Sequence, residues 1–132
     1  MRKLKVLIAD DVEIIAKANQ QIVEKNEEIE VIGLAYDGQE EYDMILELKP
    51  DIVISDNQMP KMNGVEVVKK IFESNIANPP KFIMVTADAG FAFNRKCREI
   101  GISYVIHKEN REYELEYILE ELIDVIKTSK SL

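Results

Sequence analysis

The chain has 132 residues, enough for one domain with its own hydrophobic core and too few for two. Apolar residues make up 46% of it and charged residues 32%, a composition that excludes a disordered or membrane-embedded chain. The net charge of −8 repels nucleic acid and anionic lipid, and one cysteine permits no internal disulfide, so we expect a cytoplasmic protein that binds neither nucleic acid nor membrane.

Short apolar runs alternate along the chain with longer segments of helical period. The runs are rich in Val and Ile, as buried parallel strands usually are. Strands are predicted at residues 4–9, 30–35, 51–55, 82–85 and 103–106. Helices are predicted between and after them, at residues 39–48 and around the apolar residues Ile22, Val68, Cys97 and Leu119.

This alternation predicts an α/β fold, a single doubly wound (βα)5 unit in which a five-stranded parallel sheet carries helices on both faces. Turn sequences fall between the predicted elements, at Asp37-Gly38, Asn63-Gly64 and Pro79-Pro80. Sheets of this kind bind ligands at the carboxyl ends of their strands. We therefore expect the functional residues at that edge.

Polar side chains follow four of the predicted strands. They are Asp10 and Asp11 after the first, Asp56 after the third, Thr86 after the fourth and Lys108 after the fifth. We expect them to converge at one edge of the sheet. Carboxylates gathered in a cleft raise one another's pKa unless a cation neutralises them, and a hard divalent ion such as Mg²⁺ suits a set of oxygen ligands.

Phosphoryl transfer is the chemistry that this combination favours. An Asp carboxylate can attack phosphorus to give an aspartyl-phosphate, while a metal ion and a Lys ammonium offset the charge of the phosphoryl oxygens. Asp56 and Lys108 fit those two parts. The hydroxyl of Thr86 can donate to a phosphoryl oxygen when one is present, which would make it part of a switch.

Taken together, these residues resemble the receiver domains of two-component response regulators. The resemblance runs from about residue 3 to about residue 127, and it rests on IADD at 8–11, DIVISDNQMPKMNG at 51–64, VTA at 85–87 and Lys108. It implies a flavodoxin-like sheet of strand order 2-1-3-4-5. We expect residues 1–132 to form a single receiver domain with no output domain in this chain.

The resemblance also implies a signalling switch rather than an enzyme. Asp56 would be phosphorylated by a histidine kinase or a phosphotransfer protein, and Thr86 and Lys108 would bind the phosphoryl group. The surface of the fourth helix and fifth strand would then change for a downstream protein or a fused output domain. A second copy of the chain, bound through the fourth helix, fifth strand and fifth helix, is a further candidate partner.

The same resemblance implies the ligands of the metal ion. Mg²⁺ would be held by Asp10, Asp11, Asp56 and the backbone carbonyl of Gln58. One of the first two acids is also expected to cap the helix that begins near Val12, because Asp is a favoured N-cap residue.

Three positions depart from the pattern of the family. An aromatic residue usually stands three positions before the Lys, but Val105 stands there, and Tyr104 is expected to point to the opposite face of the sheet. Glu109 takes the place of a common Pro, so the loop after the Lys is expected to follow its own path. Asp88, two residues after Thr86, would bring negative charge near the phosphoryl group and prolong its lifetime.

Two other functions stay open. A Mg²⁺-dependent phosphatase would use Asp56 as a transient nucleophile, but it needs a second acid, which Asn57 and Gln58 do not provide. A degenerate receiver that binds its partner without phosphorylation would fit the departures at Val105 and Glu109. Outside the site, the single histidine, His107, is expected to be structural or exposed, and Phe91 to lie in or near the core.

Overall fold

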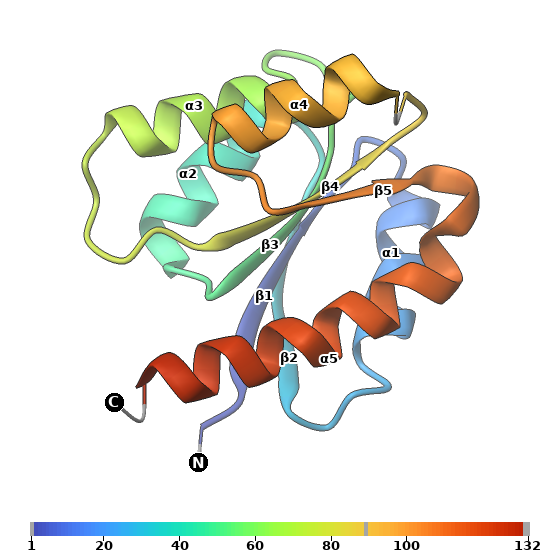
Figure 1. Ribbon diagram of the computed structural model, residues 1–132, viewed down its shortest axis with the longest axis vertical. Helices are drawn as coiled ribbons and strands as arrows, with labels where there is room; N and C mark the ends of the chain where they lie inside the picture. Colours follow the sequence, from blue (N-terminus) through green and yellow to red (C-terminus); the bar gives the residue numbers. More distant parts are fainter. Residues whose placement is uncertain (1, 89, 131–132) are drawn as a thin grey trace.

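The computed structural model describes residues 2–88 and 90–130, without the side chain of residue 130. Within these residues five strands alternate with five α-helices (Figure 1). The strands are β1 (Leu4–Ala9), β2 (Ile29–Ala35), β3 (Ile52–Asp56), β4 (Lys81–Thr86) and β5 (Tyr104–His107). The helices are α1 (Glu13–Val23), α2 (Gly38–Leu48), α3 (Gly64–Glu73), α4 (Phe91–Glu99) and α5 (Arg111–Lys130), the last preceded by the 3-10 turn η1 (Lys108–Asn110). The predicted strand bounds hold to within one residue.

The strands form one parallel sheet of order β2-β1-β3-β4-β5, which confirms the order that the resemblance implied. In the register of the sheet, Ala9 lies beside Ser55, and Thr86 lies beside His107. Asp56 is the last residue of β3. The carboxyl ends of β1, β3, β4 and β5 therefore lie next to one another along one edge.

Helices cover both faces of the sheet, as the doubly wound prediction requires (Figure 1). Helices α1 and α5 pack on one face with Ile8 and Ile54, and α2, α3 and α4 pack on the other with Leu7 and Val53. Neighbouring strand residues enter opposite layers because successive side chains of a strand alternate in direction. No helix of the described residues is long and apolar enough to cross a membrane.

The first turns of α2 and α3 are fixed by side-chain caps. Asp37 accepts a hydrogen bond from the backbone N–H of Glu40 (2.7 Å) at the start of α2. At the start of α3, Asn63 accepts from the N–H of Glu66 (2.8 Å) and the Glu66 carboxylate accepts from the N–H of Asn63 (3.2 Å), which forms a capping box. The capping box fixes where the loop between β3 and α3 ends.

The start of α1 differs from the prediction. Val12 occupies the N-cap position, and no side chain makes a capping hydrogen bond there. Asp10 accepts a hydrogen bond from the N–H of Val12 (2.9 Å) instead, so it supports the turn that leaves β1 rather than the helix itself. The expected helix cap by Asp10 or Asp11 is therefore wrong.

The end of β5 confirms one expectation. Tyr104 packs with the layer of α1 and α5, and Val105 packs with the layer of α2, α3 and α4, so the two side chains do point to opposite faces. After β5, Lys108 enters η1 directly, and His107 Nδ1 accepts from the N–H of Glu109 (3.2 Å). This short turn leads straight into α5.

Phe91 is the clearest error outside the site. Its side chain is 76% exposed at the first turn of α4, where the Arg95 guanidinium lies 5.9 Å from the centre of its ring. The buried stripe of α4 contains Phe93 and Cys97, and Phe91 lies about 200° around the helix from Phe93. The apolar character of Phe91 could not reveal this, because only the phase of the helix decides which residues meet the sheet.

Candidate functional site

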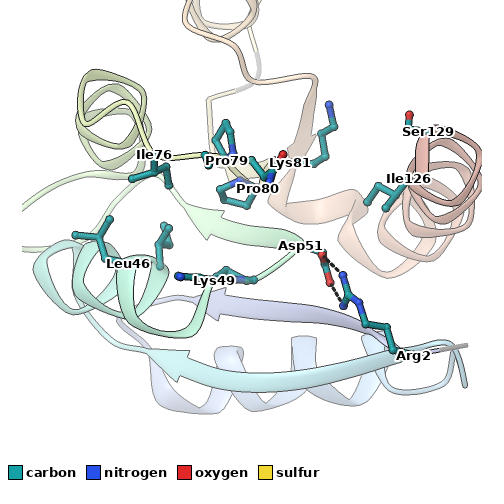
Figure 2. Close-up of a pocket in the computed structure, with 14 residues that line it drawn as sticks. Arg2, Leu46, Lys49, Asp51, Ile76, Pro79, Pro80, Lys81, Ile126 and Ser129 are labelled. Atoms are coloured by element: carbon teal, nitrogen blue, oxygen red, sulfur yellow. Dashed lines mark hydrogen bonds and ion pairs between the residues drawn. The ribbon is translucent and has the colours of Figure 1, made fainter. Parts of the chain in front are cut away.

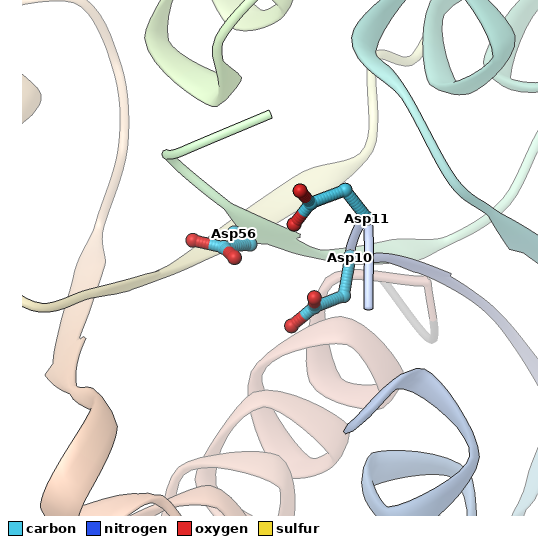
Figure 3. Close-up of side chains that lie close together, drawn as sticks. All are labelled: Asp10, Asp11 and Asp56. Atoms are coloured by element: carbon cyan, nitrogen blue, oxygen red, sulfur yellow. The ribbon is translucent and has the colours of Figure 1, made fainter. Parts of the chain in front are cut away.

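Three carboxylates converge at the carboxyl edge of the sheet (Figure 3). Asp10 and Asp11 follow β1, and Asp56 ends the neighbouring strand β3. One carboxylate oxygen from each residue lies within 4.8 Å of the other two. Asp10 and Asp56 are buried, whereas Asp11 is exposed, so the cluster reaches solvent on the side of Asp11.

Burial and like charges oppose the ionisation of Asp10. The pKa of Asp10 is raised, chiefly by burial and less by the charges of Asp56 and Asp11. Lys108 acts in the opposite direction, with its Nζ 3.2 Å from Oδ2 of Asp56. The backbone N–H of Gln58 donates to Oδ1 of Asp56 (3.0 Å), so each oxygen of that carboxylate has a positive or donor partner.

The predicted hydroxyl lies on the next strand. Thr86 ends β4 one residue beyond Val85, which pairs with Asp56 in the sheet, and its side chain is buried. Thr86 Oγ1 accepts a hydrogen bond from the N–H of Asp88 (3.0 Å), which uses a lone pair and not the hydroxyl hydrogen. The side chain of Asp88 is turned to its own loop, where Oδ1 accepts from the N–H of Gly90 (3.2 Å).

The residues present fit a hard divalent cation. Oxygens of the three carboxylates lie close together, and the Lys108 ammonium pairs with one of these carboxylates, that of Asp56. Oxygen ligands suit Mg²⁺ better than the softer transition metals. A divalent cation would also offset the charges of Asp56 and Asp11, which add to the effect of burial on the pKa of Asp10.

The sequence matches the family model of the response regulator receiver domain over residues 6–120. The chain belongs to this family. The receiver therefore has the fold and the family membership that its sequence motifs indicated, in the two-component class of signalling proteins.

Individual relatives agree with this assignment. The receiver is 30% identical over 131 residues to a protein-glutamate methylesterase/protein-glutamine glutaminase of Clostridium acetobutylicum, a match that covers 99% of this chain and 38% of the relative. It is 27% identical to the response regulator domain of Thermotoga maritima CheB, with a TM-score of 0.78 and coverage of 99% and 98% of the two chains. The receiver thus spans little more than a third of that curated relative.

A second solved structure is informative because of its ligands. It is the CheX-CheY-BeF3-Mg²⁺ complex of Borrelia burgdorferi, in which the matched chain is 27% identical to the receiver. The TM-score is 0.81, and the match covers 95% of this chain and 90% of that one. By its description, that complex contains both a magnesium ion and BeF3.

Sequence reasoning missed a further acid next to the cluster. Glu41, on α2, is fully buried, and its Oε1 accepts a hydrogen bond from Oγ of Ser55 (3.0 Å), the residue before Asp56. Burial raises the pKa of Glu41 to about 8, so the acid is mostly protonated at neutral pH. One signal was available, since Glu41 stands one helical turn before the buried Ile45 and shares its face of α2.

The receiver has a hollow at the opposite edge of the sheet, near the amino ends of β1, β3 and β4 (Figure 2). Its volume is about 1050 Å³, and its lining includes Pro79, Pro80 and a paired Arg2 and Asp51, whose side chains make two hydrogen bonds of 2.9 and 3.0 Å. Its lining contains neither the acids of the cluster nor Lys108. This hollow is therefore separate from the carboxylate cluster.

Proposed function

We propose that the receiver accepts a phosphoryl group on Asp56 from a histidine kinase or a phosphotransfer protein, in a reaction that requires Mg²⁺. One observation carries the proposal: a buried Asp56 carboxylate 3.2 Å from the Lys108 ammonium, with two more carboxylates beside it. The ammonium pairs with the carboxylate that would act as the nucleophile, and the neighbouring acids provide oxygens for a cation.

In the proposed reaction, one carboxylate oxygen of Asp56 bonds to phosphorus as the bond from phosphorus to the donor's histidine nitrogen breaks. Mg²⁺, held by Asp10, Asp11, Asp56 and the backbone carbonyl of Gln58, would offset the charge on the phosphoryl oxygens. Lys108 would pair with one of those oxygens in addition to Asp56. The Borrelia burgdorferi CheY complex, which contains Mg²⁺ and BeF3, supports a site of this kind.

The phosphoryl group would act as a switch through Thr86. Its hydroxyl hydrogen would turn to a phosphoryl oxygen and alter the loop that leads to α4. Helices α4 and α5 expose large aromatic side chains, Phe91 (76%), Tyr113 (80%) and Tyr117 (69%), which suit a downstream protein, a fused output domain or a second copy of the chain.

Intact-mass measurement after incubation with acetyl phosphate tests the proposal. Wild type should gain one phosphate when Mg²⁺ is present and none after chelation, and Asp56→Asn should gain none. The matched control is Asp124→Asn, the same change at an exposed acid of α5, which should behave as wild type. Equal phosphate on Asp56→Asn, or an unmodified wild type, would contradict the proposal.

A further inference from the structure

Glu41 is a buried acid that the proposed reaction does not use. Among the described residues the buried acids are Asp10, Glu41 and Asp56, and the first and last belong to the cluster. Only Oε1 of Glu41 has a hydrogen-bond partner in the described part of the chain, the hydroxyl of Ser55; Oε2 has none. Burying such a group is unfavourable, so its position needs a reason.

The hydroxyl of Ser55 lies where three elements of the receiver meet. It is in β3 next to Asp56, it donates to Glu41 on α2, and it lies against the first residue of α3. A β-carbon on Gly64 would come within 2.8 Å of Ser55 Oγ and 3.0 Å of the Asp56 carbonyl oxygen. The first residue of α3 is therefore tightly packed against the tip of β3.

Helix α2 also holds the loop that joins β3 to α3. The N–H of Gly38 donates to the carbonyl of Pro60 (3.2 Å), so the first turn of α2 binds the middle of that loop. Glu41, one turn later, accepts a hydrogen bond from Ser55, the second-to-last residue of β3. Between these two attachments lies Gln58, whose N–H donates to the Asp56 carboxylate. Helix α2 thus fixes both sides of the phospho-acceptor.

A neutral Glu41 can bind Ser55 without adding a negative charge next to the carboxylate cluster. Burial raises the pKa of Glu41 to about 8, and the charge of Asp56 adds to the rise while the Ser55 hydrogen bond opposes it. At neutral pH Glu41 therefore holds Ser55 without placing a further negative charge near the cluster. A glutamine in its place would keep both the shape and the acceptor oxygen.

We propose that Glu41 is a positioning residue for phosphoryl transfer, which holds the Asp56 carboxylate and the Gln58 backbone in place through the hydroxyl of Ser55. The inference rests on the proposed function, because it assigns Glu41 a part in the phosphorylation of Asp56. It predicts that cutting the link changes the reaction of folded protein, and not only the stability of the fold.

The test compares phosphorylation rates with acetyl phosphate, followed by intact mass, across a range of Mg²⁺ concentrations. Glu41→Leu fills the space but removes the acceptor, and it should lower the rate roughly tenfold, within the 10²-fold loss that a misplacement of about 1 Å can cause. Glu41→Gln should stay within about twofold of wild type, since it keeps the acceptor. Glu47→Leu, the same change at an exposed acid of α2, is the matched control and should leave the rate unchanged.

Ser55→Ala removes the other partner and supplies the same test should Glu41→Leu fail to fold. The two substitutions cut one link, so Glu41→Leu with Ser55→Ala should be no slower than the slower single variant. Urea unfolding distinguishes a positioning role from a purely structural one. If Glu41 is a positioning residue, Glu41→Leu should slow the reaction without lowering the free energy of unfolding. Wild-type rates in both single variants would overturn the inference and leave the proposed function intact. A wild type that takes up no phosphate would overturn both.

Discussion

The two edges of the sheet treat their acids in opposite ways. At the amino edge, Asp51 receives two hydrogen bonds from Arg2 and one from the N–H of Lys5 (2.8 Å), so the protein itself neutralises the charge. At the carboxyl edge, within the described residues, three carboxylates cluster and the Lys108 ammonium pairs with one of them, Asp56. An acid that the fold satisfies contributes to stability, whereas acids left in excess create a demand for a cation from solution.

The largest effect that should separate the edges is the pH dependence of stability. In the unfolded chain Glu41 loses its proton near pH 4.5, whereas in the folded protein it keeps the proton up to about pH 8. The folded state therefore binds more protons than the unfolded state between these two pH values. Stability should therefore fall as pH rises through this window, by up to about 1.4 kcal/mol per pH unit. Urea unfolding from pH 5 to 8 without Mg²⁺ should show this slope.

The control for that slope is Glu41→Gln, which cannot release a proton. The slope of its free energy of unfolding against pH should be smaller than the wild-type slope, by up to about 1.4 kcal/mol per pH unit. Equal slopes in the two proteins would show that Glu41 ionises freely in the folded state. The contrast between the two edges would then not extend to Glu41.

A smaller effect is that replacing Asp with Asn should change the free energy of unfolding in opposite directions at the two edges. Asp51→Asn at the amino edge should lower the free energy of unfolding by about 1 to 2 kcal/mol, because it weakens charge-assisted hydrogen bonds to Arg2. Asp10→Asn at the carboxyl edge should raise it in the absence of metal, by about 1 kcal/mol, since it removes a buried charge that burial and its neighbours disfavour. Denaturant unfolding of both variants in a chelating buffer checks the signs. Destabilisation by Asp10→Asn would show that the carboxyl edge is already compensated.

The smallest effect concerns Phe91, which lies after β4 on the carboxyl side of the sheet. Because its side chain is 76% exposed, Phe91→Ala should change the free energy of unfolding by less than about 0.5 kcal/mol. Phe93→Ala, on the packed face of the same helix, should cost more. Similar losses for the two substitutions, measured by urea unfolding, would place Phe91 in the packing of the fold rather than on its surface.

The main elements and the acid cluster were predictable because their signals are local. Val and Ile runs such as residues 52–54 specify buried strands, and the acids follow strands whose ends must share one edge. The hydrogen bond of Asp10 to the N–H of Val12 was missed, because the geometry of the turn after β1 decides it. The exposure of Phe91 was missed because it depends on the phase of α4.

Glu41 and Ser55 show a different limit. They are 14 residues apart, and only the packing of α2 on the tip of β3 brings them together. An acid on an amphipathic helix is most simply read as solvated, although its spacing from Ile45 hinted at burial. The partner of a buried polar group depends on tertiary contacts, and neither composition nor periodicity contains them.

The most direct test of the account is the effect of Mg²⁺ on the free energy of unfolding. Ligand that binds only folded protein stabilises it by about 2.7 kcal/mol at 100 times its dissociation constant. Wild type and Asp51→Asn should gain stability along the same saturation curve, while Asp10→Asn should need roughly tenfold more Mg²⁺ or more, a loss of about 1.4 kcal/mol in binding. Stability that does not rise with Mg²⁺ in wild type, or that rises equally in Asp10→Asn, would contradict the claim that the carboxyl edge is built for a cation.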